Sequence, residues 1–228
     1  MGCFKIPLGL CHDIEAMIKK IWWGQRGDRR KILWVKWDEL TKSKVVGGMG
    51  FRDLALYNYS LLAKQAWRLL HNRSSLFYKV FKARFFPNCS IMEAKDSRGG
   101  SYAWRSILKG QDVIQRGARW RVGDGKSINI WQHRRIPRKT SSLVVSYPIE
   151  SMDDCSVAVL INESARRWNE ELIDGIFSQE EATLIKKIPL SRRVSEDVLI
   201  WPYTQDGQYT CKTGYRFLKE EAEMRYMQ

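Results

Sequence analysis

Apolar residues recur every three or four positions along the first half of the chain, which is the spacing of helices with one buried face. This spacing predicts helices over residues 12–23, 54–70, 75–86 and 102–115. Asp53 and Ser101 directly precede two of these segments and carry side chains suited to capping a helix N-terminus. Gly110 leaves open whether the last segment forms one helix or two. Residues 34–40 fit a short helix or an extended segment equally well.

Two stretches alternate apolar and polar residues around a glycine-containing turn, the pattern of a β-hairpin. The first covers 119–131 around Gly123-Asp124-Gly125, and the second covers 198–212 around Gln205-Asp206-Gly207. Further helices are expected at 168–177, from a capping-box pattern at Ser178 to just before Pro189, and from Thr213 onward. We therefore predict a mainly α fold with two small β-hairpins (α+β), consisting of a helical N-terminal two-thirds and a smaller C-terminal module.

Positive charge is concentrated in the earlier part of the sequence. The 228 residues carry a net charge of +14. Residues 1–145 hold 29 basic and 10 acidic residues, whereas residues 146–228 hold 10 basic and 15 acidic ones. This asymmetry predicts a domain boundary near Tyr147-Pro148, and it points to a polyanion as partner of the first part. On this basis residues 1–145 should suffice for binding.

Cysteine spacing and hydropathy narrow the class of protein. The five cysteines lie far apart without a CxxC pair, so we expect reduced thiols and an intracellular protein, with nucleus and mitochondrion both open. Cys3, Cys11 and His12 do not make a four-ligand zinc set, and no metal or other cofactor is expected. No apolar run is long enough to span a membrane, and no small-molecule substrate is indicated. The oligomeric state stays open.

Basic residues interleaved with aromatic ones are the candidate binding site. Contacts to phosphate, combined with stacking of bases on aromatic rings, give sequence-tolerant binding to RNA or single-stranded DNA. Most of the ten tryptophans should nevertheless lie in the core. The weak nucleic-acid contacts are assigned to Arg26, Arg29, Arg30, Lys31, Lys79, Lys82, Arg84, Arg116, Arg119, Arg121, Lys126, Arg134 and Arg135.

An ordered series of motifs resembles the end of the reverse transcriptase, on its thumb side, in plant non-LTR (LINE-type) retrotransposon polyproteins. The same region resembles short reading frames of plant mitochondrial genomes derived from it. In chain order the motifs are Phe4-Lys5-Ile6-Pro7, Trp22-Trp23-Gly24, Gly47-Gly48-Met49-Gly50-Phe51-Arg52-Asp53-Leu54, Leu61-Leu62-Ala63-Lys64-Gln65-Ala66-Trp67-Arg68, Arg84-Phe85-Phe86-Pro87, Ser101-Tyr102-Ala103-Trp104-Arg105-Ser106-Ile107 and Gly123-Asp124-Gly125.

Residues near the end of the chain are similar to the start of the zinc-binding segment that follows the polymerase in those polyproteins. They are Trp201, Gly207, Tyr209 and Thr213-Gly214-Tyr215. The resemblance implies that residues 1–145 correspond to the thumb and connection. It also implies that residues 146–228 are a linker and the truncated opening of the zinc-binding module.

The resemblance also implies that catalytic groups of the family fall outside the matching region. The polymerase carboxylates would precede it, and the zinc ligands and ribonuclease H carboxylates would follow it. Asp153-Asp154 lacks the aromatic residue and flanking strand of a polymerase pair, so we expect no enzyme activity. Two functions stay open: a non-catalytic binder of RNA or single-stranded DNA, and an inert relic of a decayed retroelement. A third possibility is part of an RNA-directed DNA polymerase whose catalytic part is missing from this chain.

Overall fold

The chain folds as two compact units, and the first is made from both ends of the sequence. Unit 1 comprises Met1–Arg116 with Tyr209–Gln228, and unit 2 comprises Gly117–Gln208. The computed structural model describes residues 2–24, 34–42, 44, 47–96, 99–136, 143–146, 152–191 and 195–226. Contacts thus group the residues differently from the charge-based boundary between 145 and 146, because the last helix returns to the first unit.

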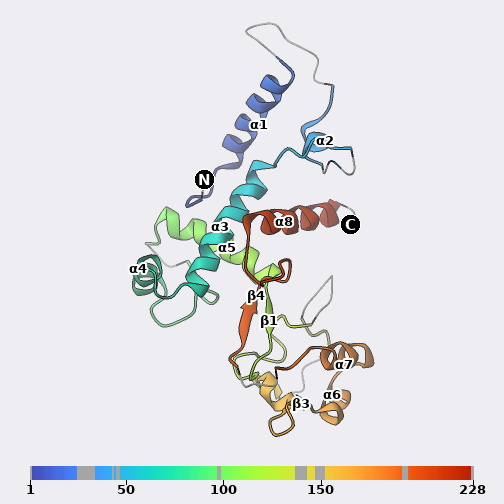
Figure 1. The fold of residues 1–228 in the computed structure, drawn as a ribbon. Coiled ribbons are helices and arrows are strands. Elements are labelled where there is room, and N and C mark those ends of the chain that lie inside the picture. Colours follow the sequence, from blue (N-terminus) through green and yellow to red (C-terminus); the bar gives the residue numbers. More distant parts are fainter. Residues whose placement is uncertain are drawn as a thin grey trace. The chain divides into compact units, whose positions relative to one another are not determined.

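Unit 1 is helical, and most of its helices follow the apolar spacing of the sequence (Figure 1). The segment at 34–40 resolves into a short helix rather than an extended segment. The helices are α1 (Leu8–Trp22), α2 (Trp37–Thr41), α3 (Leu54–His71), α4 (Leu76–Phe85), α5 (Tyr102–Gly117) and α8 (Cys211–Tyr226).

Local capping fixes where α3 and α4 begin. The Asp53 carboxylate accepts a hydrogen bond from Leu56 N at 2.8 Å, and the Ser75 hydroxyl accepts one from Tyr78 N at 3.1 Å. Each bond satisfies an amide that the helix itself leaves without a partner. The prediction of a cap at Asp53 is confirmed.

Helix α8 packs on α3 and closes unit 1 (Figure 1). Tyr209, which is fully buried, donates its hydroxyl to Ser60 O at 3.0 Å, and Lys64 Nζ donates to Tyr209 O at 2.6 Å. The predicted strand at 208–212 is wrong: Thr210 Oγ1 accepts from Thr213 N at 3.2 Å and starts the helix at Cys211 instead. A side-chain cap and burial against α3 therefore override the alternating pattern.

The described residues of unit 2 form two small two-stranded antiparallel sheets and short helices. The predicted mainly α class with two small β elements is confirmed. Strand β1 (Arg119–Arg121) pairs with β4 (Val198–Ile200), and β2 (Ile161–Asn162) pairs with β3 (Arg167–Trp168). The helical elements are the 3-10 helix η3 (Val157–Leu160), α6 (Glu170–Ile176) and α7 (Gln179–Lys186).

The predicted hairpin over 119–131 is wrong in its pairing. The Gly123-Asp124-Gly125 turn wraps around the Asp197 carboxylate, which accepts from the amides of Gly123 (2.7 Å), Gly125 (2.9 Å) and Ser127 (2.9 Å). This arrangement brings β4 beside β1, so a strand from far along the chain takes the place of the neighbouring one.

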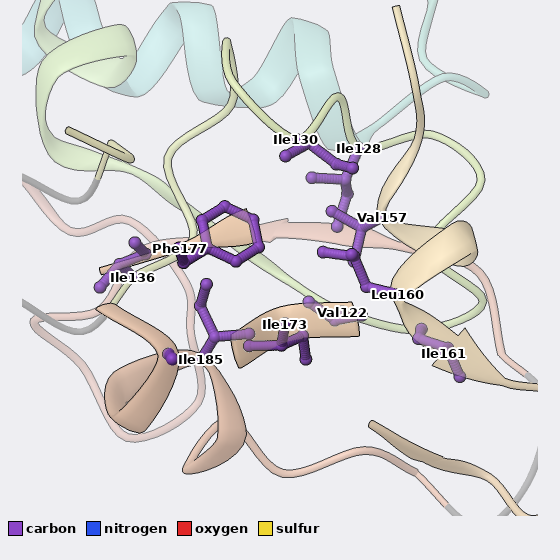
Figure 2. Packing of buried hydrophobic residues seen from close by; sticks show 11 residues of the cluster. Val122, Ile128, Ile130, Ile136, Val157, Leu160, Ile161, Ile173, Phe177 and Ile185 are labelled. Carbon is purple, nitrogen blue, oxygen red and sulfur yellow. The ribbon is translucent and has the colours of Figure 1, made fainter. Parts of the chain in front are cut away.

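The residues that follow the turn enter the core of unit 2 instead of forming a strand against β1. Ile128 and Ile130 are fully buried and pack with Val157, Leu160 and Phe177 in an apolar cluster (Figure 2).

The Ser178 cap of α7 is present, but the Glu181 side chain accepts from Val145 N and Ser146 N rather than completing a capping box.

Candidate nucleic-acid interface

A row of three phenylalanines runs along α4. Phe77, Phe81 and Phe85 follow at four-residue spacing, which places them on one side of the helix. Their ring centroids lie 4.6 Å and 5.3 Å apart, and the Phe85 ring stacks on Trp104 at 4.8 Å. The rings are half-buried, so the row rests on the core and still presents part of its surface to solvent.

An arginine lies at each end of this row. The Arg68 guanidinium, from α3, is 5.4 Å from the centre of the Phe77 ring, and the Arg84 guanidinium is 5.6 Å from that of Phe85. Both arginines are exposed, and neither forms an ion pair with a described carboxylate. We refer to Arg68, Phe77, Phe81, Arg84 and Phe85 as the α4 surface. It offers fixed positive charge beside aromatic faces, the two components of sequence-tolerant single-strand binding.

The two lysines predicted on α4 lie differently. Lys79 is exposed, but its position in the helix places it on the side away from the phenylalanine row. Lys82 is half-buried, donates to Cys89 O at 2.7 Å and lies 5.4 Å from the Phe86 ring centre, so it is less accessible to phosphate than the exposed Arg68 and Arg84. It borders a cavity of about 300 Å³ that Arg73 and Glu93 also line.

Burial lowers the pKa of His71 at the end of α3, and the nearby Arg73 lowers it further. The imidazole packs 4.2 Å from the Trp67 ring, and a pKa below the ordinary histidine value of about 6.5 favours its neutral form at pH 7. The positive charge of the α4 surface therefore comes from its arginines.

Arg116 is neutralised inside unit 1. Its guanidinium bonds to Glu221, and its Nη2 lies 3.1 Å from the Asp112 carboxylate. These three side chains line a cavity of about 430 Å³ together with Lys109 and Arg225. Because two carboxylates hold Arg116, it is a weaker candidate for phosphate than an exposed arginine.

The predicted basic residues of unit 2 differ in solvent exposure. Arg121 and Lys126 are exposed, whereas Arg119 and Arg134 are half-buried. Burial lowers the pKa of Arg119, and the neighbouring Tyr203 opposes this. These positions flank β1 and the glycine turn, as the sequence suggested, but they do not gather on one described aromatic face.

Arg135 lies in the core and faces no solvent. Its side chain is 1% exposed and donates to Ile130 O. Burial lowers its pKa to about 10, against the opposing effect of Glu181, so the group stays charged at neutral pH. Its Nε and Nη2 have no hydrogen-bond partner among the described residues. In this position Arg135 supports the interior of unit 2 and is closed to phosphate.

The remaining predicted contacts, Arg26, Arg29, Arg30 and Lys31, lie outside the described residues. Within the described part of the chain, no cluster of His, Cys, Asp and Glu could hold a metal ion. Asp153 and Asp154 are exposed in a turn before η3. None of the described helices is both long enough and apolar enough to cross a membrane.

Sequence reasoning did not assign Arg68, Phe77 or Phe81 to the site. The four-residue spacing of the phenylalanines is visible in the sequence, but ordinary packing of a helix on the core gives the same spacing. Arg68 belongs to a different helix, and only the tertiary fold brings it over Phe77.

The two units differ in net charge. Unit 1 carries 26 basic and 12 acidic residues, and unit 2 carries 13 of each. The whole excess of +14 therefore belongs to unit 1, which also holds the α4 surface.

A mainly helical, basic protein with these features has relatives in plants. The chain is 40% identical over 141 residues to the uncharacterized mitochondrial protein AtMg00310 of Arabidopsis thaliana, covering 61% of this chain and 92% of that protein. It belongs to the family of that mitochondrial protein.

A second Arabidopsis thaliana relative bears the name "Putative ribonuclease H protein At1g65750" and is 28% identical over 96% of this chain. The chain spans 36% of the length of this relative. No family model matches the sequence. No solved structure matches it either.

Proposed function

We propose that the chain is a non-catalytic part of a retrotransposon reverse transcriptase, from the thumb end onward, that binds RNA or single-stranded DNA with little sequence preference. The α4 surface carries this proposal: two exposed arginines flank a row of three rings. Phosphates would contact the arginines while bases stack on the exposed ring surface.

Two further observations support the proposal. The excess charge lies entirely in unit 1, so phosphate would be attracted to the unit that displays the rings. The named similarity to a ribonuclease H protein fits a retroelement origin, and the ordered motifs resemble the thumb end of the polymerase.

The test is fluorescence anisotropy of the full chain with labelled oligouridine and oligodeoxythymidine over a salt series. Log affinity should fall linearly with log salt, with a slope of about 0.7 per phosphate contacted. The double variant Arg68→Ala, Arg84→Ala should weaken binding and lower that slope by roughly 1 to 1.5.

The matched control is Lys95→Ala with Lys212→Ala, which removes the same charge from two other exposed positions of unit 1. An equal loss in both pairs would mean that net charge, and not the α4 surface, provides the affinity. A folded chain that binds neither oligonucleotide even at low salt would instead favour an inert relic.

A further inference from the structure

Helix α1 has an apolar stripe that the described residues of unit 1 leave exposed. Its inner side packs through the buried Cys11 and Glu15, and the Glu15 carboxylate accepts from Leu54 N at 2.8 Å. A second row runs beside it: Leu10, Met17 and Ile21 are 49%, 53% and 76% exposed. Ile14, which is half-buried, joins the inner side to this row.

The spacing of the stripe is that of a helix-helix contact. Leu10, Ile14, Met17 and Ile21 follow at intervals of four, three and four residues, as the inner positions of a coiled coil do. The row extends over about 16 Å of helix. Single exposed apolar side chains are ordinary, but a continuous row at this spacing marks an interaction surface.

Two charges identify the partner that fits. Asp13 and Lys20 are both exposed and lie seven residues apart along the same flank of the stripe. In a parallel pair of α1 helices, the flank that carries Asp13 and Lys20 faces the opposite flank of the second helix, so these charges do not meet each other. In an antiparallel pair, Asp13 of one helix faces Lys20 of the other, and this occurs twice because the pair has a two-fold axis.

The same orientation also aligns the apolar residues. The antiparallel arrangement sets Leu10 against Ile21 and Ile14 against Met17 of the second copy. We propose that α1 is a self-association surface through which two copies of this chain form an antiparallel helix pair. Four side chains make a small contact compared with the roughly 800 Å² per partner of a stable interface, so the dimer is weak and reversible.

Sedimentation velocity of the nucleic-acid-free full chain, from about 1 μM to 1 mM, tests the proposal over the range in which weak dimers dissociate. The wild-type chain should shift from monomer to dimer as concentration rises. Met17→Glu should weaken the dimer by about tenfold or more, because it places an unpaired charge inside the contact. Its melting temperature should stay that of wild type, since Met17 is exposed in the monomer.

Met224→Glu is the matched control, since Met224 lies on α8 and is also 53% exposed. It should leave the dimer unchanged. A wild-type chain that is monomeric throughout overturns the proposal, as does a dimer that survives Met17→Glu or responds equally to Met224→Glu. A monomeric chain would mean that some other protein covers the stripe.

Charge exchange tests the orientation. Asp13→Lys and Lys20→Asp should each weaken the dimer, and the double exchange in one chain should restore it, because every facing pair is again of opposite sign. In a parallel pair these charges do not face each other, so the single exchanges should not weaken the dimer and the double exchange has nothing to restore. A double variant as weak as the single variants therefore refutes the antiparallel contact.

Discussion

Gly110 lies where the backbones of α5 and α3 come closest. A Cβ atom added there would meet the Leu62 carbonyl carbon at 2.3 Å, which no side-chain adjustment relieves. Glycine weakens a helix by about 1 kcal/mol relative to alanine, so its presence inside α5 needs such a reason. The close approach of α3 and α5 therefore explains why a glycine lies at position 110, inside the single helix α5.

We expect Gly110→Ala to destabilise unit 1 by about 2 to 4 kcal/mol, because the two helices must separate. Gly9→Ala, on α1, meets nothing within 4 Å and should instead be neutral or stabilising by up to about 1 kcal/mol. Urea unfolding followed by circular dichroism measures both. Similar effects of the two substitutions would show that the α3–α5 approach is not tight.

Tyr209 should make unit 1 sensitive to alkali. Burial raises the pKa of its hydroxyl, and the nearby Cys211 raises it further. A raised pKa in the folded state means that the stabilisation is complete below the unfolded pKa of about 10 and declines as pH rises above it, since only the unfolded chain releases the proton.

The comparison is with Tyr209→Phe, which loses the hydrogen bond to Ser60 O and about 1 kcal/mol at neutral pH. Between pH 9 and about 11, the unfolding free energy should fall more steeply for wild type than for this variant. Parallel curves for the two proteins would contradict the role assigned to the buried hydroxyl.

Helix α4 has no fully buried residue, so its aromatic row can be changed with little loss of core. Phe77→Leu combined with Phe81→Leu keeps the apolar bulk and removes the flat faces. We expect affinity for single strands to fall by roughly 1 to 3 kcal/mol per base that no longer stacks, with little change in the salt slope.

Phe217→Leu, a substitution of the same kind on α8, is the control and should leave affinity unchanged in the folded fraction. Anisotropy at fixed salt measures the effect. If both kinds of variant bind like wild type, charge alone holds the nucleic acid.

The helices could be predicted from sequence because their signals are local: apolar spacing and caps such as Asp53 lie within a few residues of one another. The β1–β4 pair could not, since its strands are far apart in sequence and the deciding contact is one carboxylate, Asp197, against three distant amides. Burial of Arg135 escaped prediction for the same reason. The sequence pattern of a basic cluster is the same whether its side chains face water or the core.

Unit 1 needs both ends of the chain, and this changes the expected binding fragment. Residues 1–145 lack α8, which packs on α3. This fragment also ends inside unit 2, which runs from Gly117 to Gln208. We expect a chain ending at residue 208 to lose the cooperative unfolding of unit 1, because removing α8 exposes the core around Trp67. Tryptophan fluorescence during urea unfolding tests this. A cooperative transition of wild-type midpoint would refute it.

The full chain should not extend a primer on an RNA template with Mg²⁺ or Mn²⁺. The resemblance assigns the family's two-metal carboxylates to a region before these motifs, and the exposed Asp153 and Asp154 lie in a turn. Labelled nucleotide incorporation is the measurement. Sustained incorporation that copurifies with the chain would refute the non-catalytic reading.

The return of α8 to α3 also sets an order of events during synthesis. Helix α3 ends at His71 and α8 begins at Cys211, so a ribosome adding about 5 to 20 residues per second reaches α8 roughly 7 to 30 s after α3. Throughout that interval the nascent chain displays the apolar side of α3 that α8 later covers. All of unit 2 is synthesised within the same interval, before the last helix of unit 1. Unit 1 is thus begun before unit 2 and completed after it, so chaperones have longer access to its exposed apolar surface during synthesis.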